Sequence, residues 1–482
     1  MNLERVIAAL APTDVVQRAS VEISDLAYDT RAVRRGALFF CVPGERHDGH
    51  GFARDAVERG AVALVVQRPL GLDVPQLVVR DARAAMARAA VAFFGDPTRE
   101  LEIAGVTGTN GKTTTTFLLA TILAAAGRQP GLLGTIESRI GGERRPAIRT
   151  TPEAIDLQRA FREMLDAGDR SCALEATSHG SELGRLDGVR FSALAFTNLT
   201  QDHLDFHGTF ERYFDAKRRL FIQGDRPPAA INVGDDHGRR LAEELRRLGH
   251  EALLTFGFAD DADLRPEQLE LGSDGARFRA GGLELRTSLR GRFNIENVLA
   301  AVGVSRLLGI EDTAIARGVE ALGGVPGRFE SVDEGQPFAV VVDYSHKPDA
   351  LENVLRTARD LARNRVICVF GCGGDRDRGK RPVMGRIATE LADVAIVTSD
   401  NPRSEDPDAI IAEVLEGAGP DAEVEPDRRL AIERAIGLAE EGDVVVVAGK
   451  GHEQGQELAD RTIPFDDRDV AREALRRLGA AL

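Results

Sequence analysis

Two spacings of apolar residues alternate along the chain, one typical of strands and one typical of helices. In the first hundred residues, the stretches that predict strands cover 23–28, 37–42, 61–66 and 76–79. An Ala-rich stretch at 82–94 has helical spacing and ends at Gly95-Asp96-Pro97, a sequence that favours a boundary. We therefore expect a small N-terminal α/β domain over residues 1–98.

Apolar strands followed by helices dominate the middle of the chain. The predicted strands, apolar throughout as in a parallel sheet, cover 101–106, 172–176, 192–198 and 229–233. Alternating residues at 253–258, 276–280 and 283–289 predict an antiparallel addition, with Gly281-Gly282 as its turn. A helix over 294–308 and a Gly-rich segment at 323–327 complete a central domain that we place at 99–328.

Strands and helices alternate again in the last third. Strands are predicted at 338–342, 366–370, 394–397 and 444–447, and helices near 348–363, 380–391 and 428–440. Ligands of open α/β sheets bind beyond the carboxyl ends of the strands, so the loops there should carry the chemistry. We expect a Rossmann-like C-terminal domain over 329–482 and an α/β, three-domain chain.

Composition narrows the class of protein. The 482 residues are 43% hydrophobic and 29% charged, which excludes disordered, collagen-like and coiled-coil chains. Asp and Glu outnumber Lys and Arg by 77 to 62, a net charge of -15. Such a surface repels phosphate backbones and anionic lipid, so we expect no nucleic-acid and no membrane partner. An anionic substrate requires a local basic pocket.

The four cysteines are too few and too scattered for a disulfide framework, and the Cys368/Cys372 pair lacks the second half of a zinc site. We interpret them as reduced, mostly buried thiols. Glu4 and Arg5 interrupt the first apolar stretch, and no run reaches about 18 uncharged apolar residues. These features predict a cytoplasmic protein.

A glycine-rich loop lies between a predicted strand and a predicted helix, the context of a phosphate-binding loop. Its expected nucleotide-binding residues are Thr107, Gly108, Thr109, Asn110, Gly111, Lys112 and Thr113. Backbone N–H groups can surround phosphate oxygens, while the lysine reaches the outer phosphates and the last threonine ligates magnesium. The strict pattern places its first glycine where Val106 stands, but the context disfavours a turn without nucleotide.

The sequence of this loop, Thr107 to Thr113, resembles the ATP loop of the Mur ligase family, which includes the folylpolyglutamate synthetases. Further motifs match in order: Thr150-Thr151-Pro152, Glu175 to Gly180, Thr197-Asn198-Leu199, Asp202 to Asp205, Asp215-Ala216-Lys217, Gly291 to Asn294, Pro326-Gly327-Arg328, Asp343 to His346, Asp400 to Arg403 and Gly449 to Glu453. Each motif alone is weak, whereas the ordered set is highly specific.

The resemblance implies a reaction. It is strongest to the ligases that use ATP and Mg²⁺ to join meso-diaminopimelate to UDP-N-acetylmuramoyl-L-alanyl-D-glutamate through an acyl phosphate, in peptidoglycan precursor synthesis. ATP is expected between the central and C-terminal domains, and we expect a monomer. The implied catalytic residues are Lys112, Glu175, His203 and Lys217, and the implied metal ligands are Thr113, Glu175, His203 and Lys217.

For Lys217, the role implied by the resemblance differs most from what the spacing alone predicts. Spacing alone predicts a solvated lysine on a helix over 209–222, and His203 alone would be an ordinary surface or capping histidine. The family instead carbamylates the lysine of this motif, which converts a cation into a carboxylate-like metal ligand. Arg218 and Arg219 stay protonated, so Lys217 is the candidate.

The rest of the nucleotide site also follows from the resemblance. Asn294 should meet the adenine side, Asp343 the ribose hydroxyls and Arg328 the phosphates. A helix cap for Asn294 and a surface charge in a linker for Arg328 are the structural alternatives.

The resemblance assigns the UDP substrate to polar residues in the first two domains: Tyr28, Thr30, Glu45, Arg46, His47, Thr150, Thr151, Thr177 and Arg185. Hydroxyl and guanidinium groups suit a ligand with a pyrophosphate and carboxylates. Leu183 stands where a polar contact is expected, and Thr177 replaces the usual serine. Ordinary surface polarity is the alternative for the 45–47 loop.

The amino-acid pocket is assigned to the C-terminal domain: Arg376, Asp400, Asn401, Pro402, Arg403, Gly449 and Glu453. Arg403 offers a planar fork for the carboxylate by which diaminopimelate differs from lysine, and Glu453 should take an ammonium group. Asp406 is the expected cap, before Pro407, of a helix that fixes the exit of this loop.

Three other functions compete with this one. A lysine-adding or folate-type ligase is disfavoured by the 400–403 motif. A P-loop GTPase is disfavoured because the chain has no Asn-Lys-x-Asp guanine motif. A non-catalytic scaffold would release no phosphate from ATP when an acceptor is added, and a ligase would.

Overall fold

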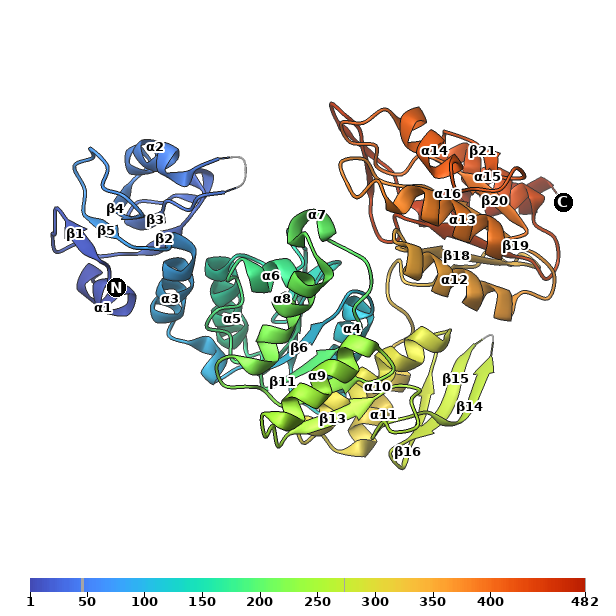
Figure 1. Ribbon diagram of the computed structural model, residues 1–482, viewed down its shortest axis with the longest axis horizontal. Helices are drawn as coiled ribbons and strands as arrows, with labels where there is room; N and C mark the ends of the chain where they lie inside the picture. The colour runs from blue at the N-terminus through green and yellow to red at the C-terminus, as the bar shows by residue number, and fades with distance from the viewer. Residues whose placement is uncertain (45–46, 273, 482) are drawn as a thin grey trace. The chain divides into compact units, whose positions relative to one another are not determined.

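The computed structural model describes residues 1–44, 47–272 and 274–481 (Figure 1). By its contacts, the chain forms two compact units. The first contains Met1–Thr107, Gly127–Leu194 and Ala216–Pro228, and the second contains Gly108–Ala126, Ala195–Asp215 and Ala229–Leu482. The short strand β11 (Ala193–Phe196) and the helix α8 (Phe210–Ile222) pass from one unit to the other.

A five-stranded sheet of order β1-β5-β4-β3-β2 opens the first unit. Its elements are α1 (Leu3–Leu10), β1 (Asp14–Val16), β2 (Asp25–Ala27), η1 (Thr30–Ala32), β3 (Ala37–Phe40), η2 (Gly49–Phe52), α2 (Ala53–Glu58), β4 (Ala61–Val66), β5 (Gln76–Val78), α3 (Ala82–Phe94) and η3 (Pro97–Arg99). Alternate residues of β3 and β4 pack against α1 and α3 on one face and against α2 on the other. Both faces are therefore covered, which explains why the central strands are apolar throughout.

The helix predicted at 82–94 has the ends that its sequence indicates. Asp81 accepts hydrogen bonds from the amides of Arg83 and Ala84, and Gly95 closes the helix in the left-handed conformation.

The rest of the first unit is built on strands ordered β6-β10-β7-β8-β9. Its elements are β6 (Glu102–Thr107), β7 (Pro130–Leu133), β8 (Glu137–Ile140), β9 (Glu143–Pro146), α5 (Ala154–Ala167), β10 (Ser171–Glu175) and α6 (Ser178–Glu182). Strand β10 runs parallel to β6 and β7, and Glu175 pairs with Val106. The antiparallel strands β8 and β9 have no apolar run: Ile140 is the one buried residue of β8, and all four residues of β9 are exposed.

The second unit begins with the phosphate-loop helix. Its elements up to residue 321 are α4 (Lys112–Ala125), α7 (Leu204–His207), β12 (Ala229–Asn232), α9 (Asp236–Arg247), β13 (Leu253–Phe256), β14 (Glu267–Gly272), β15 (Gly275–Ala280), β16 (Leu283–Thr287), α10 (Arg292–Leu307) and α11 (Asp312–Ala321). The antiparallel pair β15–β16 confirms the hairpin predicted around Gly281-Gly282. The prediction that 253–258 joins this antiparallel group is wrong, because β13 pairs in parallel with β12. Two strands joined through the helix α9 can run in parallel, which a tight turn does not allow.

The C-terminal elements, orange to red in Figure 1, surround a six-stranded sheet of order β17-β18-β22-β19-β20-β21. They are β17 (Glu330–Val332), β18 (Ala339–Asp343), α12 (Pro348–Leu361), β19 (Val366–Phe370), α13 (Lys380–Leu391), β20 (Val394–Val397), α14 (Pro407–Leu415), β21 (Glu423–Val424), α15 (Arg428–Leu438), β22 (Val444–Ala448), β23 (Gly455–Glu457), β24 (Thr462–Pro464) and α16 (Asp467–Ala481). Only β17 runs antiparallel to its neighbour in this sheet. Helices α12, α13 and α14 cover one face, and α15 and α16 the other. The Rossmann-like arrangement predicted for this region is thus confirmed.

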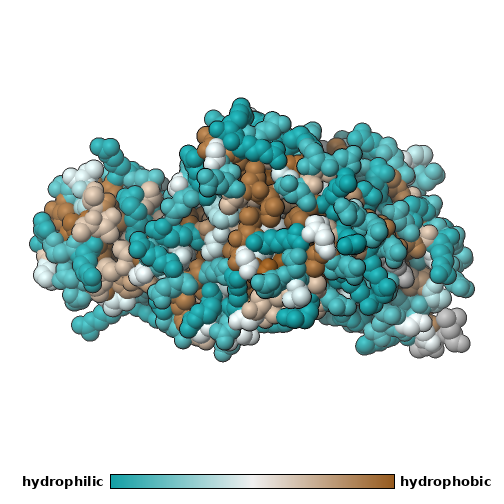
Figure 2. All heavy atoms as spheres, turned by 90° about the horizontal axis from the view of Figure 1, so that it is seen from below, coloured by the Kyte–Doolittle hydropathy of each residue, from teal (hydrophilic) through white to brown (hydrophobic). Residues whose placement is uncertain are grey.

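The polar surface and the buried cysteines agree with what the composition predicts. Hydrophilic residues predominate on the face drawn in Figure 2. No helix in the part of the chain that the structure describes is long and apolar enough to cross a membrane. All four cysteines are buried and unpaired, as predicted, and burial raises the pKa of the Cys372 thiol to about 11.

One fully buried ion pair fixes the carboxyl edge of the C-terminal sheet. Arg428, the first residue of α15, donates to Asp467 Oδ1 and Oδ2 at 2.8 and 2.7 Å, and both side chains are 0% exposed. Its Nη2 also donates to Ala448 O at 3.0 Å, at the end of β22. Arg428 thereby holds α15, α16 and β22 together.

Breaking this pair should destabilise the protein strongly. We expect Asp467→Asn to lower the free energy of unfolding by about 3–5 kcal/mol, because Arg428 is left buried without a counter-charge. Asp469→Asn, which breaks the exposed pair of Asp469 with Arg472 on the same helix, should cost under about 1 kcal/mol. Urea unfolding measures both, and equal losses would contradict this role for the buried pair.

Candidate functional site

The predicted phosphate loop joins β6 to α4, and two of its glycines leave no room for a side chain. A Cβ atom on Gly108, whose φ is +150°, would lie 1.8 Å from Thr197 Oγ1. A Cβ atom on Gly111, whose φ is +85°, would lie 2.2 Å from Asn297 Oδ1. Glycine is therefore required at both positions, because it alone tolerates this backbone and so close an approach.

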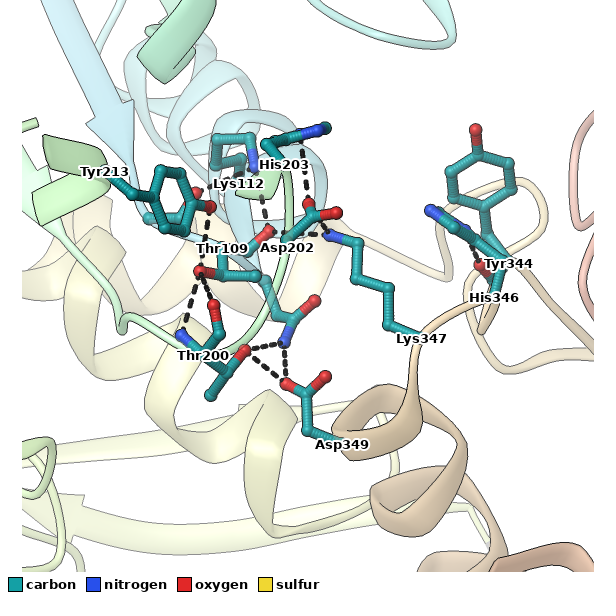
Figure 3. A network of polar contacts seen from close by, with 12 residues as sticks. Thr109, Lys112, Thr200, Asp202, His203, Tyr213, Tyr344, His346, Lys347 and Asp349 are labelled. Carbon is teal, nitrogen blue, oxygen red and sulfur yellow. Dashed lines mark hydrogen bonds and ion pairs between the residues drawn. The ribbon is translucent and has the colours of Figure 1, made fainter. Parts of the chain in front are cut away.

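Hydrogen bonds fix this loop to the segment that follows β11. The amides of Thr109 and Asn110 donate to Asn198 O and Asn198 Oδ1, both at 2.9 Å. Thr109 Oγ1 lies 3.0 Å from the hydroxyl of the buried Tyr213 and accepts from the amide of Thr200 at 3.0 Å (Figure 3). The loop is therefore held in shape by protein groups alone.

Two lysine ammonium groups converge on the carbonyl of Thr109 (Figure 3). Lys112 Nζ donates to Thr109 O and to Gly108 O, both at 2.9 Å. Lys347, which precedes α12, donates to the same Thr109 oxygen at 3.4 Å and is 9% exposed. Positive charge thus gathers at the loop although the chain as a whole is acidic.

Asp202 balances part of this positive charge. Its Oδ2 lies 2.7 Å from Lys347 Nζ and 3.0 Å from His203 Nε2. Burial acts to raise the pKa of Asp202, but Lys347 and His203 outweigh it and hold that pKa well below its usual value. His203 itself is exposed, and its φ is +53°.

Asp349, in the first turn of α12, contacts both loops described above. Its Oδ2 accepts from Asn110 Nδ2 and, at 2.6 Å, from Thr200 Oγ1 (Figure 3). Asp349 and Lys347 therefore connect the start of α12 to the phosphate loop.

The residues expected at the rest of the nucleotide lie close to these. Arg328 Nη2 donates to Thr113 Oγ1 at 3.1 Å, and its guanidinium lies 4.5 Å from the centre of the Tyr344 ring. Buried Asp343 accepts from the amide of Phe329 at 2.6 Å, and burial raises its pKa. These contacts rule out an exposed linker charge at Arg328.

Asn294 is the third residue of α10 rather than its first, and Gly291 occupies the cap position. The expectation that Asn294 begins the helix, and the alternative that it caps it, are therefore wrong. Its Nδ2 donates to Arg290 O at 2.8 Å, and its Oδ1 accepts from Asn297 Nδ2 at 3.0 Å.

In the first unit, Glu175 and a group of threonines form a second polar cluster. Glu175 ends β10 as predicted and is 1% exposed, with its carboxylate accepting from the amide and hydroxyl of Thr135 at 2.8 and 3.0 Å. Thr135 Oγ1 also lies 3.1 Å from Thr150 Oγ1. Thr151 donates to Glu175 O at 2.7 Å and accepts from Thr177 Oγ1 at 2.9 Å. The structure thus brings together Glu175 and the three threonines predicted to bind substrate.

Arg185 completes this cluster. Its Nη1 donates to Thr151 O at 3.3 Å, and its Nη2 lies 3.0 Å from Glu153 Oε1. Arg149 and Arg83 pair with the same glutamate at 2.5 and 3.3 Å. Three guanidinium groups around one carboxylate leave a positively charged cluster in an acidic protein, as an anionic ligand requires.

The N-terminal residues expected to bind substrate are only partly described. Tyr28 donates to Asp156 Oδ2 at 2.6 Å and is half-buried. Thr30 begins η1, and the ring of His47 lies 6.0 Å from that of Phe52. Glu45 and Arg46 lie outside the described residues.

Lys217 is 1% exposed on α8, so the alternative of a solvated lysine is wrong. The signal was present in the sequence. Tyr213, Phe214 and Phe221 stand four and three residues before it and four after it, and all three are buried. Leu183 closes α6, and the structure gives no polar role to its side chain.

The predicted metal ligands suit Mg²⁺ by their chemistry. Glu175 is a buried carboxylate held only by the neutral donor groups of Thr135 among the described residues, so its negative charge remains for a cation. No three His, Cys, Asp or Glu side chains of the described chain are close enough to bind a metal by themselves. Mg²⁺ commonly completes its shell with one or two carboxylates, phosphates and water, so this set does not argue against it.

The C-terminal motifs meet at the carboxyl ends of β20 and β22, where they were predicted. Asn401 Nδ2 donates to Glu453 Oε2 at 2.8 Å, and the fully buried Lys450 donates to Asn401 Oδ1 and Glu453 Oε2 at 2.8 and 3.2 Å. A Cβ atom on Gly449 would lie 2.4 Å from Oδ2 of Asp400. Glu453 therefore already has a cationic neighbour in Lys450, which the sequence interpretation missed.

Arg403 and Arg376 flank this group of motifs. Arg403 Nε lies 2.6 Å from Glu457 Oε2, and its Nη1 donates to Gly374 O at 2.9 Å. Arg376, beyond β19, is exposed. Pro402 is buried between Asn401 and Arg403. The helix that follows is capped by Asp406 with Pro407 at its first turn, as predicted.

Sequence reasoning missed several residues of these clusters: Lys347, Asp349, Thr135, Glu153 and Lys450. Lys347 directly follows the 343–346 motif and precedes a proline at a helix start, which was the available signal. Nothing in the sequence marks Thr135 or Glu153 as a contact residue, apart from their closeness to the motifs along the chain.

Three family models match the chain, in the order expected for three domains. They are described as "Mur ligase family, catalytic domain" for residues 22–107, "Mur ligase middle domain" for 106–305 and "Mur ligase, glutamate ligase domain" for 327–451. They confirm the three-domain architecture, while the boundaries at 98 and 328 stay predictions.

The chain is also similar to known proteins over almost its whole length. Two curated proteins named UDP-N-acetylmuramoyl-L-alanyl-D-glutamate--2,6-diaminopimelate ligase, from Geobacillus thermodenitrificans and Solibacter usitatus, are 46% and 47% identical, and the matches cover 99% of both chains in each case. A solved structure with the same name is 35% identical with a TM-score of 0.68, covering 95% of each chain. With the family models matching in this order and relatives nearly half identical along almost the whole length, the chain belongs to the Mur ligase family.

Proposed function

We propose that the chain is an ATP-dependent ligase that joins meso-diaminopimelate to the D-glutamate of UDP-N-acetylmuramoyl-L-alanyl-D-glutamate, a step of peptidoglycan precursor synthesis. Relatives with this printed name over their full length support the proposal. The observation that carries it is the loop of Asp400 to Arg403 at the carboxyl end of β20, joined to Glu453 through Asn401.

ATP is proposed to bind the phosphate loop, from Thr107 to Thr113. The convergence of Lys112 and Lys347 on Thr109 O supports this, because a triphosphate needs several cations. Arg328, which contacts Thr113, is assigned to the phosphates. Asn294 and Asp343 are assigned to the adenine and the ribose.

Mg²⁺ is proposed to accompany ATP, with Thr113, Glu175, His203 and carbamylated Lys217 as its protein ligands. When bound, it neutralises phosphate oxygens and polarises the transferring phosphoryl group. Carbamylation would give the buried Lys217 an oxygen ligand for Mg²⁺, which an ammonium group cannot provide.

The UDP substrate is assigned to Tyr28, Thr30 and the 45–47 loop, together with Thr150, Thr151, Thr177 and Arg185. The bonds among the threonines and Arg185 support a shared ligand for them. Arg403 and Arg376 are assigned to the distal carboxylate of diaminopimelate, and Glu453 with Asn401 to its amino group.

The reaction needs no covalent enzyme intermediate. The D-glutamate carboxylate attacks the γ-phosphorus of ATP, and ADP leaves. The diaminopimelate amine then attacks the acyl carbon, loses a proton, and inorganic phosphate leaves. The chain's own groups contribute charge neutralisation at the phosphates and orientation of the two substrates, which are the main sources of rate in such transfers.

Acceptor-dependent phosphate release tests the proposal. With ATP and the UDP substrate present, meso-diaminopimelate should stimulate release, whereas lysine should not. Replacing ATP by GTP should abolish it. Release that is independent of any acceptor, or stimulated equally by lysine, would overturn the proposal.

Lys112→Ala should lower turnover roughly 10²-fold or more, because the outer phosphates lose a preorganised cation. Arg247→Ala, at the exposed end of α9, is the control with an equal loss of charge. Steady-state phosphate release measures both. A decrease of only a few-fold for Lys112→Ala would show that the loop does not hold ATP.

Lys217→Ala should be nearly inactive yet folded, and short-chain carboxylic acids should restore part of the activity by replacing the missing oxygen ligand. Arg212→Ala, on the exposed face of the same helix, should stay active and indifferent to the acids. Circular dichroism checks folding. Normal turnover of Lys217→Ala would contradict the assignment.

Arg403→Ala should lower kcat/KM for meso-diaminopimelate. We expect a loss that corresponds to about 2–5 kcal/mol of activation free energy, the usual cost of truncating one partner of a buried charge pair. The unmutated chain should reject lysine by roughly 10⁴-fold, because lysine lacks the carboxylate that Arg403 and Arg376 are proposed to bind. Arg461→Ala, exposed in the same domain, is the control. The same kcat/KM for diaminopimelate in Arg403→Ala and in the unmutated chain would refute the pocket.

A further inference from the structure

The two arginines assigned to the distal carboxylate lie on different loops. Arg376 belongs to the loop of residues 371–379 after β19, and Arg403 to the loop of residues 398–406 after β20. We name these the β19 loop and the β20 loop. Both arginines can bind one carboxylate only if these loops keep a fixed spacing.

A fully buried arginine lies beneath both loops. Arg381, the second residue of α13, is 0% exposed. Its Nη1 and Nη2 donate to Glu405 Oε2 and Oε1 at 3.0 and 2.9 Å, which is a bidentate contact with the β20 loop. Nη2 also donates to Gly373 O at 3.3 Å, in the β19 loop. A single guanidinium therefore contacts both loops.

Glu405 extends this link to the residue beside Arg376. Glu405 Oε1 accepts from the amide of Asp375 at 2.6 Å. Asp375, whose φ is +53°, returns to the β20 loop, since its carboxylate accepts from Ser404 Oγ and N at 2.6 and 3.2 Å. Each loop thus holds the other through side chains next to the two arginines.

Arg403 is itself supported by the β19 loop. Its Nη1 donates to Gly374 O, and its backbone φ is +51°. A Cβ atom on Gly374 would lie 1.9 Å from Pro402 O, so the two backbones are in direct contact. Hydrogen bonds from Ser404 are the largest cause of a lowered pKa of Asp375, and Arg403 and Arg376 lower it further.

We propose that Arg381 is a positioning residue for the acceptor amino acid: through Glu405 and Gly373 it fixes the spacing of the β19 and β20 loops, so that Arg376 and Arg403 meet the same carboxylate. The proposal rests on the function proposed above for those two arginines. Arg381 touches no substrate in this role and acts only through the loops.

The planar fork of arginine is essential to this role. Lysine keeps the positive charge but has one ammonium, which cannot hold both oxygens of Glu405 and Gly373 O in fixed geometry. Arg381 Nη1 also donates to Glu413 Oε2 at 2.7 Å. Arg381→Lys therefore keeps Glu405 and Glu413 neutralised while it loosens the link between the loops. Glu405→Gln weakens the same link from the other side and still offers an oxygen to the amide of Asp375.

The experiment compares steady-state constants for all three substrates. For Arg381→Lys and Glu405→Gln we expect KM for meso-diaminopimelate to rise roughly 10- to 100-fold, the usual cost of losing a group that orients a binding residue. KM for ATP and for the UDP substrate should stay within about two-fold, and the preference for diaminopimelate over lysine should fall in parallel. A merely structural role would not produce this selective pattern.

Arg378→Gln is the matched control. Arg378 pairs with Glu413, as Arg381 does, but Arg378 is 65% exposed and the structure gives it no bond to Glu405 or Gly373. Its removal should leave all three KM values and the acceptor preference unchanged.

Two outcomes would overturn the proposal. One is an unchanged KM for diaminopimelate in folded Arg381→Lys and Glu405→Gln, and the other is an equal rise in KM for all three substrates. If Arg381→Lys does not fold, Glu405→Gln and Ser404→Ala decide, since both weaken the link at its less buried end. Failure of the pocket itself is recognised separately, because Arg403→Ala would then retain its kcat/KM for diaminopimelate.

Discussion

Buried charge must be paired, and in this chain that constraint determines where the loops at the carboxyl edge of the C-terminal sheet can lie. Arg428 and Asp467 are both 0% exposed, and Arg428 also binds the end of β22. Arg381 applies the same constraint to the loops after β19 and β20. Lys450 applies it to Asn401 and Glu453. Each buried cation donates to backbone carbonyl and acidic groups at this edge of the sheet and so holds them in place.

Local groups of cations explain how an acidic chain can bind the anionic substrates of the proposed reaction. The net charge is -15, yet Lys112 and Lys347 converge at the phosphate loop. Elsewhere Arg83, Arg149 and Arg185 gather around Glu153. Local groups of cations at the polar clusters therefore coexist with an overall negative charge. Pairing with Asp202 lets Lys347 be buried, and an incoming anion needs only to compete with that carboxylate.

Sequence predicted the strands well where apolar runs mark burial on both faces, as in β4 and β19. It did not show β9, because a strand with four exposed residues has no apolar signal. It gave β13 the wrong direction, since alternation reveals a strand but not the partner beside which it runs.

For the candidate site, motifs identified Glu175, Arg403 and Asn401, whose positions follow directly from strand ends. Lys347, Glu405 and Lys450 were missed as contact residues because their partners are distant in sequence. Such partners depend on how loops meet in space, and that information is not local. Lys217 was assigned from the family resemblance, while the apolar residues around it on α8, which indicate its burial, were not recognised.

The buried thiols have a practical consequence. Cys372 lies at the base of the β19 loop, 2% exposed, with a pKa raised to about 11 by burial. At neutral pH the thiol is protonated and shielded, so alkylating reagents can reach it only when the loop opens. Cys41, Cys172 and Cys368 are equally buried and lie in strands or at their ends. The rate at which Cys372 is alkylated therefore measures how often the β19 loop exposes this thiol, without any added probe.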